Sequence, residues 1–486
     1  MYLGIDLGTS GIKVVLVDET ETVRATHTEA LEVSRLHPGW SEQNPEDWWQ
    51  ATLRAIDSLA QSHGPALAAV RGIGLSGQMH GAVLLDRAGH PLRPAILWND
   101  TRSEAECRLL EERLPNLGQI TGNPAMPGFT APKLLWVRTH EPDVFAQTAK
   151  VLLPKAYLRY RLSGEMIEEM SDAAGTLWLD VGARAWSEEV LAATGLPLSA
   201  MPRLVEGSAP AGQLSDDLRA RWRMETSPVI AGGAGDNAAG AVGLGAIRPG
   251  SAFLSLGTSG VLWVTTDRFR PNPEAAVHAF CHAIPGLWHQ MGVTLSAAAS
   301  LAWWSRVAGE KEATLLQNLP EAPSAPSEAT FLPYLSGERT PHNDGMIRGA
   351  FLGLSQDTTR AAMTQAVLEG VAFSFRDCLD ALRSAGTEIT EADVIGGGSR
   401  SGTWITILAS VLGLTLHRLA DGEHGAAFGA ARLGRLAATG EDPATLCTPP
   451  RRLSAVAPIP ALQEAYEARL PFYRALYPAI KGARTA

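Results

Sequence analysis

The chain has 486 residues, which is too long for one ordinary hydrophobic core and predicts two or three domains. Apolar residues make up 45% of the chain and charged residues 19%, a composition that excludes an intrinsically disordered protein. The 51 acidic side chains outnumber the 41 basic ones and give a net charge of −10, which argues against nucleic acid as the main partner.

The cysteines and the apolar runs bear on the compartment. Four cysteines lie far apart without a CxxC pair, so we expect free thiols in a reducing cytoplasm. The N-terminus begins MYLGIDLG and does not have the basic segment of a signal peptide. Residues 275–305 carry no Asp, Glu, Lys or Arg, but histidines, glycines and Pro285 interrupt them, so we expect core elements rather than a membrane span.

The start of the chain is predicted to form a strand, a tight turn and a second strand. The turn is LGTSG at residues 7–11, and the same five residues recur at 256–260. Each copy lies between two short apolar runs: MYLGI and IKVVLV, then AFLSL and VLWVTT. Because the flanking pattern repeats as well, the sequence predicts two related domains, 1–246 and 247–486, divided near the turn at 248–250.

Between and after the two copies, strand and helix patterns alternate, which predicts an α/β fold. The first stretch contains a helix that begins near Pro45 with Asn44 as its N-cap. The expected helices cover residues 45–61, 103–114, 294–308, 358–385 and 424–438, and the expected strands cover 69–77, 82–86, 95–100 and 391–399.

The glycine-rich turns are candidate phosphate sites. The chain has no GxxxxGK[ST] motif, and its one GxGxxG, at 72–77, is followed by a strand instead of the helix that a dinucleotide needs. The LGTSG turns expose successive N–H groups with little side-chain bulk and could cradle phosphates from two sides. Asp6 could reach a Mg²⁺ ion and Lys13 could balance phosphate charge. The alternative is a pair of ordinary hairpin turns.

Two further glycine-rich segments end predicted strands. In AGGAGDNAAGAVG (231–243), Asp236 and Asn237 lie where a strand meets a helix, so Asp236 is either a helix N-cap or a catalytic carboxylate in a cleft. In IGGGSRS (395–401), three glycines would let a flat heterocycle or a sugar lie on the backbone, unless they form a plain β-to-α turn. A zinc site at His278, Cys281, His282 and His289 has weak support, because no second cysteine pair exists.

With these pieces in hand, the chain resembles the FGGY carbohydrate kinases over nearly its whole length. The resemblance rests on long segments, and GFTAPKLLWVRTH (128–140) is similar to the family's first signature. Ala234 stands where a third glycine is expected, which is a small departure. The other segments include MYLGIDLGTSGIKVVLVDE (1–19), GLSGQMHGAVLLD (74–86), AGGAGDNAAGAVG, FLPYLSGERTPHND (331–344) and GGGSRS (396–401).

The resemblance implies a two-domain α/β fold of the actin-like ATPase type, shared by sugar kinases, Hsp70 and actin, with a central cleft. It implies transfer of a phosphoryl group from ATP with Mg²⁺ to D-xylulose; ribulose, gluconate and glycerol are alternative substrates, and an actin-like ATPase without a sugar substrate is a further alternative. The resemblance allows a homodimer.

The resemblance also assigns roles to residues. It implies Asp236 as the general base and Asp6 as the carboxylate beside Mg²⁺. The sugar-contacting positions are Met79, His80, Asp236 and Asn237. The ATP-binding positions are Thr9, Lys13, Gly257, Thr258, Gly397, Gly398 and Ser401.

Overall fold

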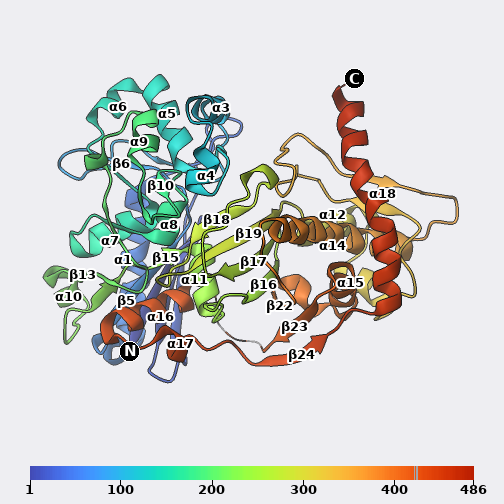
Figure 1. The fold of residues 1–486 in the computed structure, drawn as a ribbon. Helices are drawn as coiled ribbons and strands as arrows, with labels where there is room; N and C mark the ends of the chain where they lie inside the picture. The colour runs from blue at the N-terminus through green and yellow to red at the C-terminus, as the bar shows by residue number, and fades with distance from the viewer. Residues whose placement is uncertain (421, 423–424, 486) are drawn as a thin grey trace.

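The computed structural model describes residues 1–420, 422 and 425–485, and its centre is formed by two seven-stranded mixed sheets (Figure 1). The first sheet has the order β13-β14-β5-β1-β2-β3, with β15 also paired to β5. Its strands are β1 (Tyr2–Leu7), β2 (Gly11–Val17), β3 (Val23–Ala30), β5 (Gly72–Gly77), β13 (Pro210–Gln213), β14 (Val229–Ala231) and β15 (Ala234–Gly235).

The second sheet has the order β18-β19-β17-β16-β22-β23-β24. Its strands are β16 (Ala252–Leu256), β17 (Gly260–Thr266), β18 (His278–Cys281), β19 (Trp288–Thr294), β22 (Glu391–Ile395), β23 (Thr415–Leu419) and β24 (Arg452–Val456). Short two-stranded pairs lie outside the sheets: β4 (Glu42–Gln43) with β7 (Ala95–Ile96), β6 (Val83–Leu85) with β8 (Lys150–Leu152), β9 (Ile167–Glu169) with β12 (Arg203–Val205), β10 (Leu179–Asp180) with β11 (Ala185–Trp186), and β20 (Thr330–Leu332) with β21 (Ala350–Leu352).

Helices cover both sheets, and the predicted alternation of strands and helices is confirmed. Before the second repeat they are α1 (Pro45–Ser62), α2 (Gly64–Ala68), α3 (Glu104–Arg113), α4 (Leu117–Thr121), α5 (Thr130–His140), α6 (Pro142–Gln147), α7 (Pro154–Ser163), α8 (Met170–Ala174), α9 (Glu188–Thr194), α10 (Asp216–Arg221) and α11 (Asp236–Gly243). After it they are α12 (Ala298–Ala308), α13 (Glu312–Gln317), α14 (Arg360–Ser384), α15 (Gly402–Leu412), α16 (Ala426–Thr439), α17 (Pro443–Leu446) and α18 (Pro460–Thr485).

The strand–turn–strand unit predicted at both LGTSG copies is present. β1 pairs antiparallel with β2 and parallel with β5, and β16 pairs antiparallel with β17 and parallel with β22. Each hairpin therefore has a parallel neighbour whose carboxyl end lies beside the hairpin turn. Open α/β sheets bind ligands at such carboxyl ends.

Local sequence signals explain several element bounds. Asn44 caps α1, because its side chain accepts a hydrogen bond from the backbone N–H of Glu46 at 3.1 Å. The segment expected as one strand over 95–100 forms only the two residues of β7, after which the chain turns. The helix expected over 424–438 is α16, but its predicted first residue, His424, lies outside the described residues.

Helix α16 packs against the first sheet, although in the sequence it lies between β23 and β24 of the second sheet (Figure 1). Glycines make this approach very close: a Cβ atom on Gly74 would lie 1.7 Å from the backbone oxygen of Ala430. Likewise, a Cβ on Gly429 would lie 1.8 Å from the backbone oxygen of Ala239 in α11. α16 therefore ties β5 to α11, whereas the division at 246 and 247 stays a prediction.

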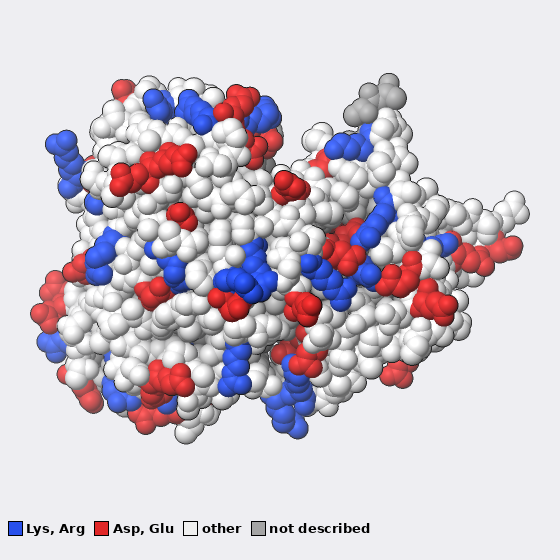
Figure 2. All heavy atoms as spheres, in the orientation of Figure 1, with Lys and Arg blue, Asp and Glu red and all other residues white. Residues whose placement is uncertain are grey.

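The surface in Figure 2 has acidic and basic side chains interspersed over both lobes, without a broad field of one sign, and an indentation between the lobes at the upper edge. A mixed surface of this kind does not attract a polyanion over a wide area. Within the described residues, no helix combines the length and apolar character that crossing a membrane requires.

The Gly74→Ala variant tests the packing of α16. The added methyl group would overlap the Ala430 carbonyl, so the helix must move away from β5, and we expect a loss of roughly 1–3 kcal/mol in unfolding free energy. Thermal and urea unfolding measure this loss. The matched control is Gly64→Ala, where a Cβ meets nothing within 4 Å. Equal stability of the two variants would contradict the close approach.

Candidate active site

Three segments of the first half meet at the carboxyl end of β5. Leu7 of β1 and Gly235 of β15 both pair with Gly77, the last residue of β5. The pairing brings together Asp6, the loop that begins at Gln78, and the start of α11. Residues far apart in the sequence are therefore fixed in one place by backbone pairing.

Asp236 is the first residue of α11, directly after β15, as the sequence predicted. It is not the N-cap, a position held by Gly235. The Oδ1 atom of Asp236 accepts hydrogen bonds from the backbone N–H of Asn237 at 2.7 Å and from its side-chain amide at 2.9 Å. No described residue donates a hydrogen bond to Oδ2, which leaves that oxygen for a ligand.

The Asp236 carboxyl has a raised pKa, so it is protonated more readily than an ordinary aspartate. Burial and the nearby negative charge of Asp6 raise the pKa of the Asp236 carboxyl to about 7, although the hydrogen bonds from Asn237 oppose the shift. A carboxylate with such a pKa is a suitable proton acceptor near neutral pH.

Lys13 lies directly opposite Asp6 in the β1–β2 register, on the same face of the sheet.

The first LGTSG turn is held by buried amides. The hydroxyl of Thr9 donates to Gln78 Oε1 at 2.9 Å and accepts from the indole N–H of Trp98 at 2.9 Å. Gln43 donates to the backbone oxygen of Thr9 at 2.8 Å and accepts from Gln78 Nε2 at 2.9 Å. The Thr9 hydroxyl thus already donates one hydrogen bond and accepts another within the protein. The backbone N–H groups of Thr9 and Ser10 have no acceptor in the described part of the chain and form the open side of the turn.

Met79 and His80 follow β5; Met79 packs against Gly235, beside Asp236, whereas His80 is held by Gly175. A Cβ atom on Gly235 would lie 2.8 Å from Met79 Sδ, so a larger residue there would force the Met79 side chain to move. His80 has φ of 70°, an unusual value for a residue other than glycine, and its Nδ1 donates to the backbone oxygen of Gly175 at 2.6 Å. Burial lowers the pKa of His80 to about 3. The ring is therefore neutral, and its Nε2 is an acceptor.

Lys133 holds the backbone of His80. Its ammonium group is buried and donates to the backbone oxygens of His80 at 2.9 Å and Gly128 at 2.7 Å. Burial lowers the pKa of Lys133 to about 7, while the charge of Asp100 raises it. The oxygen of His80 also accepts from the Thr130 hydroxyl at 3.1 Å. These contacts fix the unusual backbone conformation of His80.

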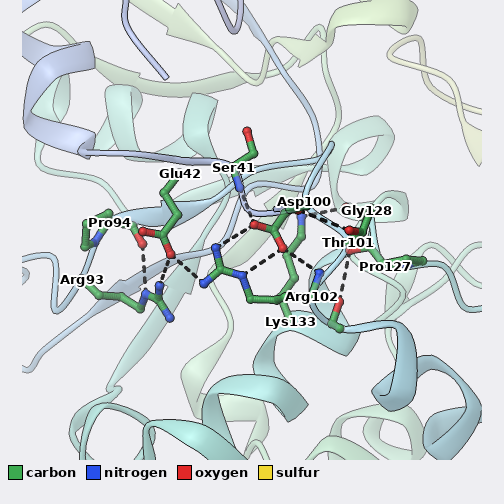
Figure 3. A network of polar contacts seen from close by, with 12 residues as sticks. Ser41, Glu42, Arg93, Pro94, Asp100, Thr101, Arg102, Pro127, Gly128 and Lys133 are labelled. Atoms are coloured by element: carbon green, nitrogen blue, oxygen red, sulfur yellow. Dashed lines mark hydrogen bonds and ion pairs between the residues drawn. The ribbon is translucent and has the colours of Figure 1, made fainter. Parts of the chain in front are cut away.

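An ion-pair network lies beside Lys133 (Figure 3). Figure 3 shows Arg102 between Asp100 and Glu42, with ion pairs of 2.7 Å to each, and Arg93 also pairs with Glu42. Asp100 accepts a hydrogen bond from the backbone N–H of Ser41 at 2.6 Å. The network fixes the segment that carries Trp98 and so supports the first turn from the other side.

The five predicted C-terminal site residues form a second group, at the ends of β16 and β22. Ser255 pairs with Ile395, which brings the second LGTSG turn beside the glycine-rich loop. A Cβ on Gly398 would lie 2.9 Å from Leu256, whereas a Cβ on Gly397 would meet nothing. Of these two glycines, Gly397 therefore leaves room for a ligand and Gly398 serves packing. The group is Gly257, Thr258, Gly397, Gly398 and Ser401.

Ser401 and Thr258 have different local roles. The side chain of Ser401 caps α15 by accepting from the backbone N–H of Trp404 at 3.3 Å. Thr258 is exposed at the hairpin tip, where its backbone oxygen accepts from Ala297 at 3.0 Å. As in the first turn, the backbone N–H groups of Thr258 and Ser259 have no acceptor within the described residues. Both hairpin tips therefore present open N–H groups.

A buried acidic cluster near Asp236 consists of Glu168, Glu169 and Asp172. In the described part of the chain, it is the one group of three His, Cys, Asp or Glu side chains with metal-binding spacing. The Lys155 ammonium lies 2.8 Å from Glu168 and 3.5 Å from each of the other two carboxylates, which is where a metal ion would have to be. The cluster also supports the site, because the backbone N–H of Gly235 donates to Ser171, which donates to Glu169. The Lys155 ammonium thus lies among the carboxylates and offsets part of their negative charge.

The weakly supported zinc site is not assembled. His278 Nδ1 donates to Asn123 at 2.7 Å, and the two ring nitrogens of His282 bond with backbone groups of Ala246 and Ile284. The ring of His289 stacks on Trp263 with centroids 3.7 Å apart. These histidines pack and bond within the protein.

Sequence reasoning missed the supporting residues. Gln78 and Lys133 both lie in segments quoted for the resemblance, yet nothing in the local pattern says what they contact. A usable signal existed for Lys133, because a lysine inside an apolar helix needs buried partners.

Comparison with known proteins agrees with this architecture. Residues 1–243 match the model of the N-terminal domain of the FGGY family of carbohydrate kinases, and residues 252–438 match that of its C-terminal domain. A xylulose kinase from Escherichia coli K12 is 51% identical over 448 residues, which are 91% of each chain.

Solved structures extend the likeness to the fold. The structure of a xyloylose kinase from Brucella ovis superposes with a TM-score of 0.97, at 55% identity over 99% of both chains. The xylulose kinase from Rhodospirillum rubrum gives a TM-score of 0.92, at 28% identity over the full length of both chains. The predicted fold class, a two-domain α/β sugar-kinase fold, is confirmed, and the chain belongs to the FGGY family of carbohydrate kinases.

Proposed function

We propose that this protein transfers the γ-phosphoryl group of ATP to the terminal hydroxyl of D-xylulose, giving ADP and D-xylulose 5-phosphate. The observation that carries the proposal is the position of Asp236, half-buried at the end of β5 with one carboxylate oxygen open and a pKa near neutrality. The names of the relatives supply the sugar: at about half identity over nine-tenths of the chain, a shared substrate is the expected case.

Asp236 is the proposed general base. Its open Oδ2 accepts the proton of the hydroxyl as the hydroxyl oxygen attacks the γ-phosphorus and the bond to the β-phosphate oxygen breaks. Phosphoryl transfer asks little covalent work of the protein, so orientation and charge neutralisation dominate. The two hydrogen bonds from Asn237 fix the carboxylate in one orientation.

The sugar contacts are proposed at Met79, His80 and Asn237, around Asp236. Neutral His80 offers Nε2 as an acceptor for a sugar hydroxyl, because Nδ1 is held by Gly175. Met79 offers an apolar surface to the carbon chain of the sugar. The side chain of Asn237 is exposed beside Asp236 and can donate to a neighbouring hydroxyl.

The proposed ATP contacts come from both halves. Open N–H groups at the tips of the two hairpins, at Thr9 and Thr258, would bind phosphate oxygens from opposite sides. Lys13 would balance phosphate charge. The remaining contacts lie at Gly257 and at the loop after β22, where Gly397, Gly398 and Ser401 would line the adenosine.

The residues present fit a magnesium ion at Asp6. Asp6 lies near the end of β1, and its negative charge raises the pKa of Asp236. Carboxylate and phosphate oxygens are the donors that a hard divalent cation prefers. Asp6 would hold Mg²⁺ through a carboxylate oxygen, with phosphate oxygens and waters as the other ligands. When bound, the ion neutralises charge on the transferring group.

A sugar panel tests the proposed function. In a coupled assay of ADP formation with Mg²⁺ and ATP, we expect D-xylulose to be turned over with the highest kcat/KM among D-xylulose, ribulose, gluconate and glycerol. A preference for one of the other three would replace the substrate and keep the family chemistry. Sugar-independent ATP turnover at the same rate would favour an actin-like ATPase and contradict the proposal.

The Asp236→Asn variant tests the general base. The amide keeps the size of the side chain but cannot accept the proton, so we expect kcat to fall about 10²- to 10⁴-fold. ATP binding, measured by calorimetry, should stay close to wild type. The matched control is Asp216→Asn, because Asp216 is likewise the first residue of a helix but is exposed. Normal turnover by Asp236→Asn would remove Asp236 from this role.

The ionisation of Asp236 can be followed directly. In the ligand-free protein we expect its carboxyl to titrate near pH 7, in its acid form below that pH and as the active carboxylate above it. The Asp6→Asn variant removes a nearby negative charge, so the titration should move to lower pH. Carbon-13 NMR of the aspartate carboxyls, assigned with Asp236→Asn, measures both values. A titration that stays in place or moves to higher pH would contradict the electrostatic contact.

A further inference from the structure

We propose that Arg339, in the second half of the chain, binds the sugar at the end remote from the reacting hydroxyl. The inference rests on the proposed function and extends it to substrate specificity. It concerns the segment 331–344, which the roles assigned above leave without a function.

The backbone around Arg339 is rigidly held. Its neighbour Glu338 is buried and accepts hydrogen bonds from the Thr294 hydroxyl at 2.7 Å and from the backbone N–H of Arg339 itself at 2.8 Å. The other neighbour, Thr340, is also buried and donates to the backbone oxygen of Ala276 at 2.9 Å. Arg339 therefore projects from an anchored loop, which suits a residue that must meet a ligand in one geometry.

The guanidinium group of Arg339 has only uncharged partners. One Nη1 contact is to the sulfur of Met126, in the first half of the chain, and the other is to His278 Nε2 at 3.5 Å. The Nδ1–H group of His278 donates a hydrogen bond to Asn123, so the Nε2 atom of the neutral ring is an acceptor. Of the described carboxylates, none lies within ion-pair distance of Arg339, in contrast with Arg102 and its two acidic partners.

Because Arg339 has no acidic partner, its guanidinium group has N–H donors left to bind a ligand. A guanidinium has five N–H donors, and these two contacts use one nitrogen. The side chain is half-buried, so a ligand that supplies oxygen acceptors would replace the water that the group loses on burial. The Glu338 carboxylate does not fill this role, because its oxygens face Thr294 and the backbone.

Arg339 lies near His80, and the ring of Phe129 packs beside both His80 and a partner of Arg339. The positive charge of Arg339 contributes to the low pKa of His80, after burial, so the two side chains are near each other. The ring of Phe129 connects them: its centroid is 4.7 Å from that of His80 and 5.9 Å from that of His278, the partner of Arg339. Met79, the residue before His80, packs against Gly235, the residue before Asp236.

The proposed binding mode places an open-chain ketose along these residues. When the terminal hydroxyl meets Asp236 and the middle of the chain meets Met79 and His80, the hydroxyketone end with C1 and C2 points to Arg339. Guanidinium N–H groups donate well to hydroxyl and ketone oxygens. Arg339 thereby selects a substrate with oxygens at that end, and the sugar is held by both halves of the chain.

The test compares D-xylulose with its analogue that lacks the C1 hydroxyl, on wild type and on Arg339→Met. We expect the variant to raise KM for D-xylulose about 10- to 100-fold and KM for the analogue by less than about 3-fold, with KM for ATP unchanged. Arg339→Lys, which keeps the charge and some donors, should lose less than Arg339→Met. Calorimetric binding of both sugars gives the same comparison without turnover.

The controls separate the outcomes. Arg348→Met changes an exposed arginine shortly after the segment 331–344. Its side chain donates to backbone oxygens of its own turn, so the variant should leave both KM values as in wild type. Thermal unfolding checks that the variants are folded. Equal losses on the two sugars, or no loss, would overturn the role of Arg339. Failure of wild type to phosphorylate D-xylulose would instead overturn the proposed function.

Discussion

The carboxyl end of β5 is the constraint on which the site depends. Gly77 pairs through its backbone with both Leu7 and Gly235. This pairing holds their neighbours, Asp6 and Asp236, close together. In this position, burial first and the charge of Asp6 second raise the pKa of Asp236 to about 7. A lone carboxylate on a surface helix would be fully ionised and poorly placed. Here the sheet itself supplies both the position and the basicity of the proposed general base.

The same arrangement occurs twice. The hairpin and its parallel neighbour in the first sheet, β1, β2 and β5, correspond to β16, β17 and β22 in the second. In the first copy the loop after the parallel strand carries Met79 and His80, and in the second it carries Gly397 and Gly398. A repeated unit thus gives two carboxyl ends with open N–H groups, and in the proposed function the loop of the first copy would bind the sugar and that of the second the nucleotide. α16, which follows β23 of the second sheet in the chain, packs on β5 and α11 of the first half.

The sequence predicted what is local or repeated. The hairpins, the strand-to-helix junction at Asp236 and the Asn44 cap could be read from short patterns, because turn chemistry and capping act within a few residues. Contacts over long distances could not: Lys133 reaches the backbone of His80, and Gln78 reaches Thr9, across a separation of 69 residues. The commitment of the Thr9 hydroxyl and the separate roles of Gly397 and Gly398 also depend on the pairing of distant strands, which no local pattern contains.

A crystal structure with D-xylulose and a non-hydrolysable ATP analogue tests the central claim most directly. The account predicts the terminal hydroxyl of the sugar within hydrogen-bond distance of Asp236 Oδ2, in line with the γ-phosphate, and phosphate oxygens on the N–H groups of both hairpin tips. A γ-phosphate that contacts only one hairpin, or a sugar whose terminal hydroxyl faces away from Asp236, would contradict it.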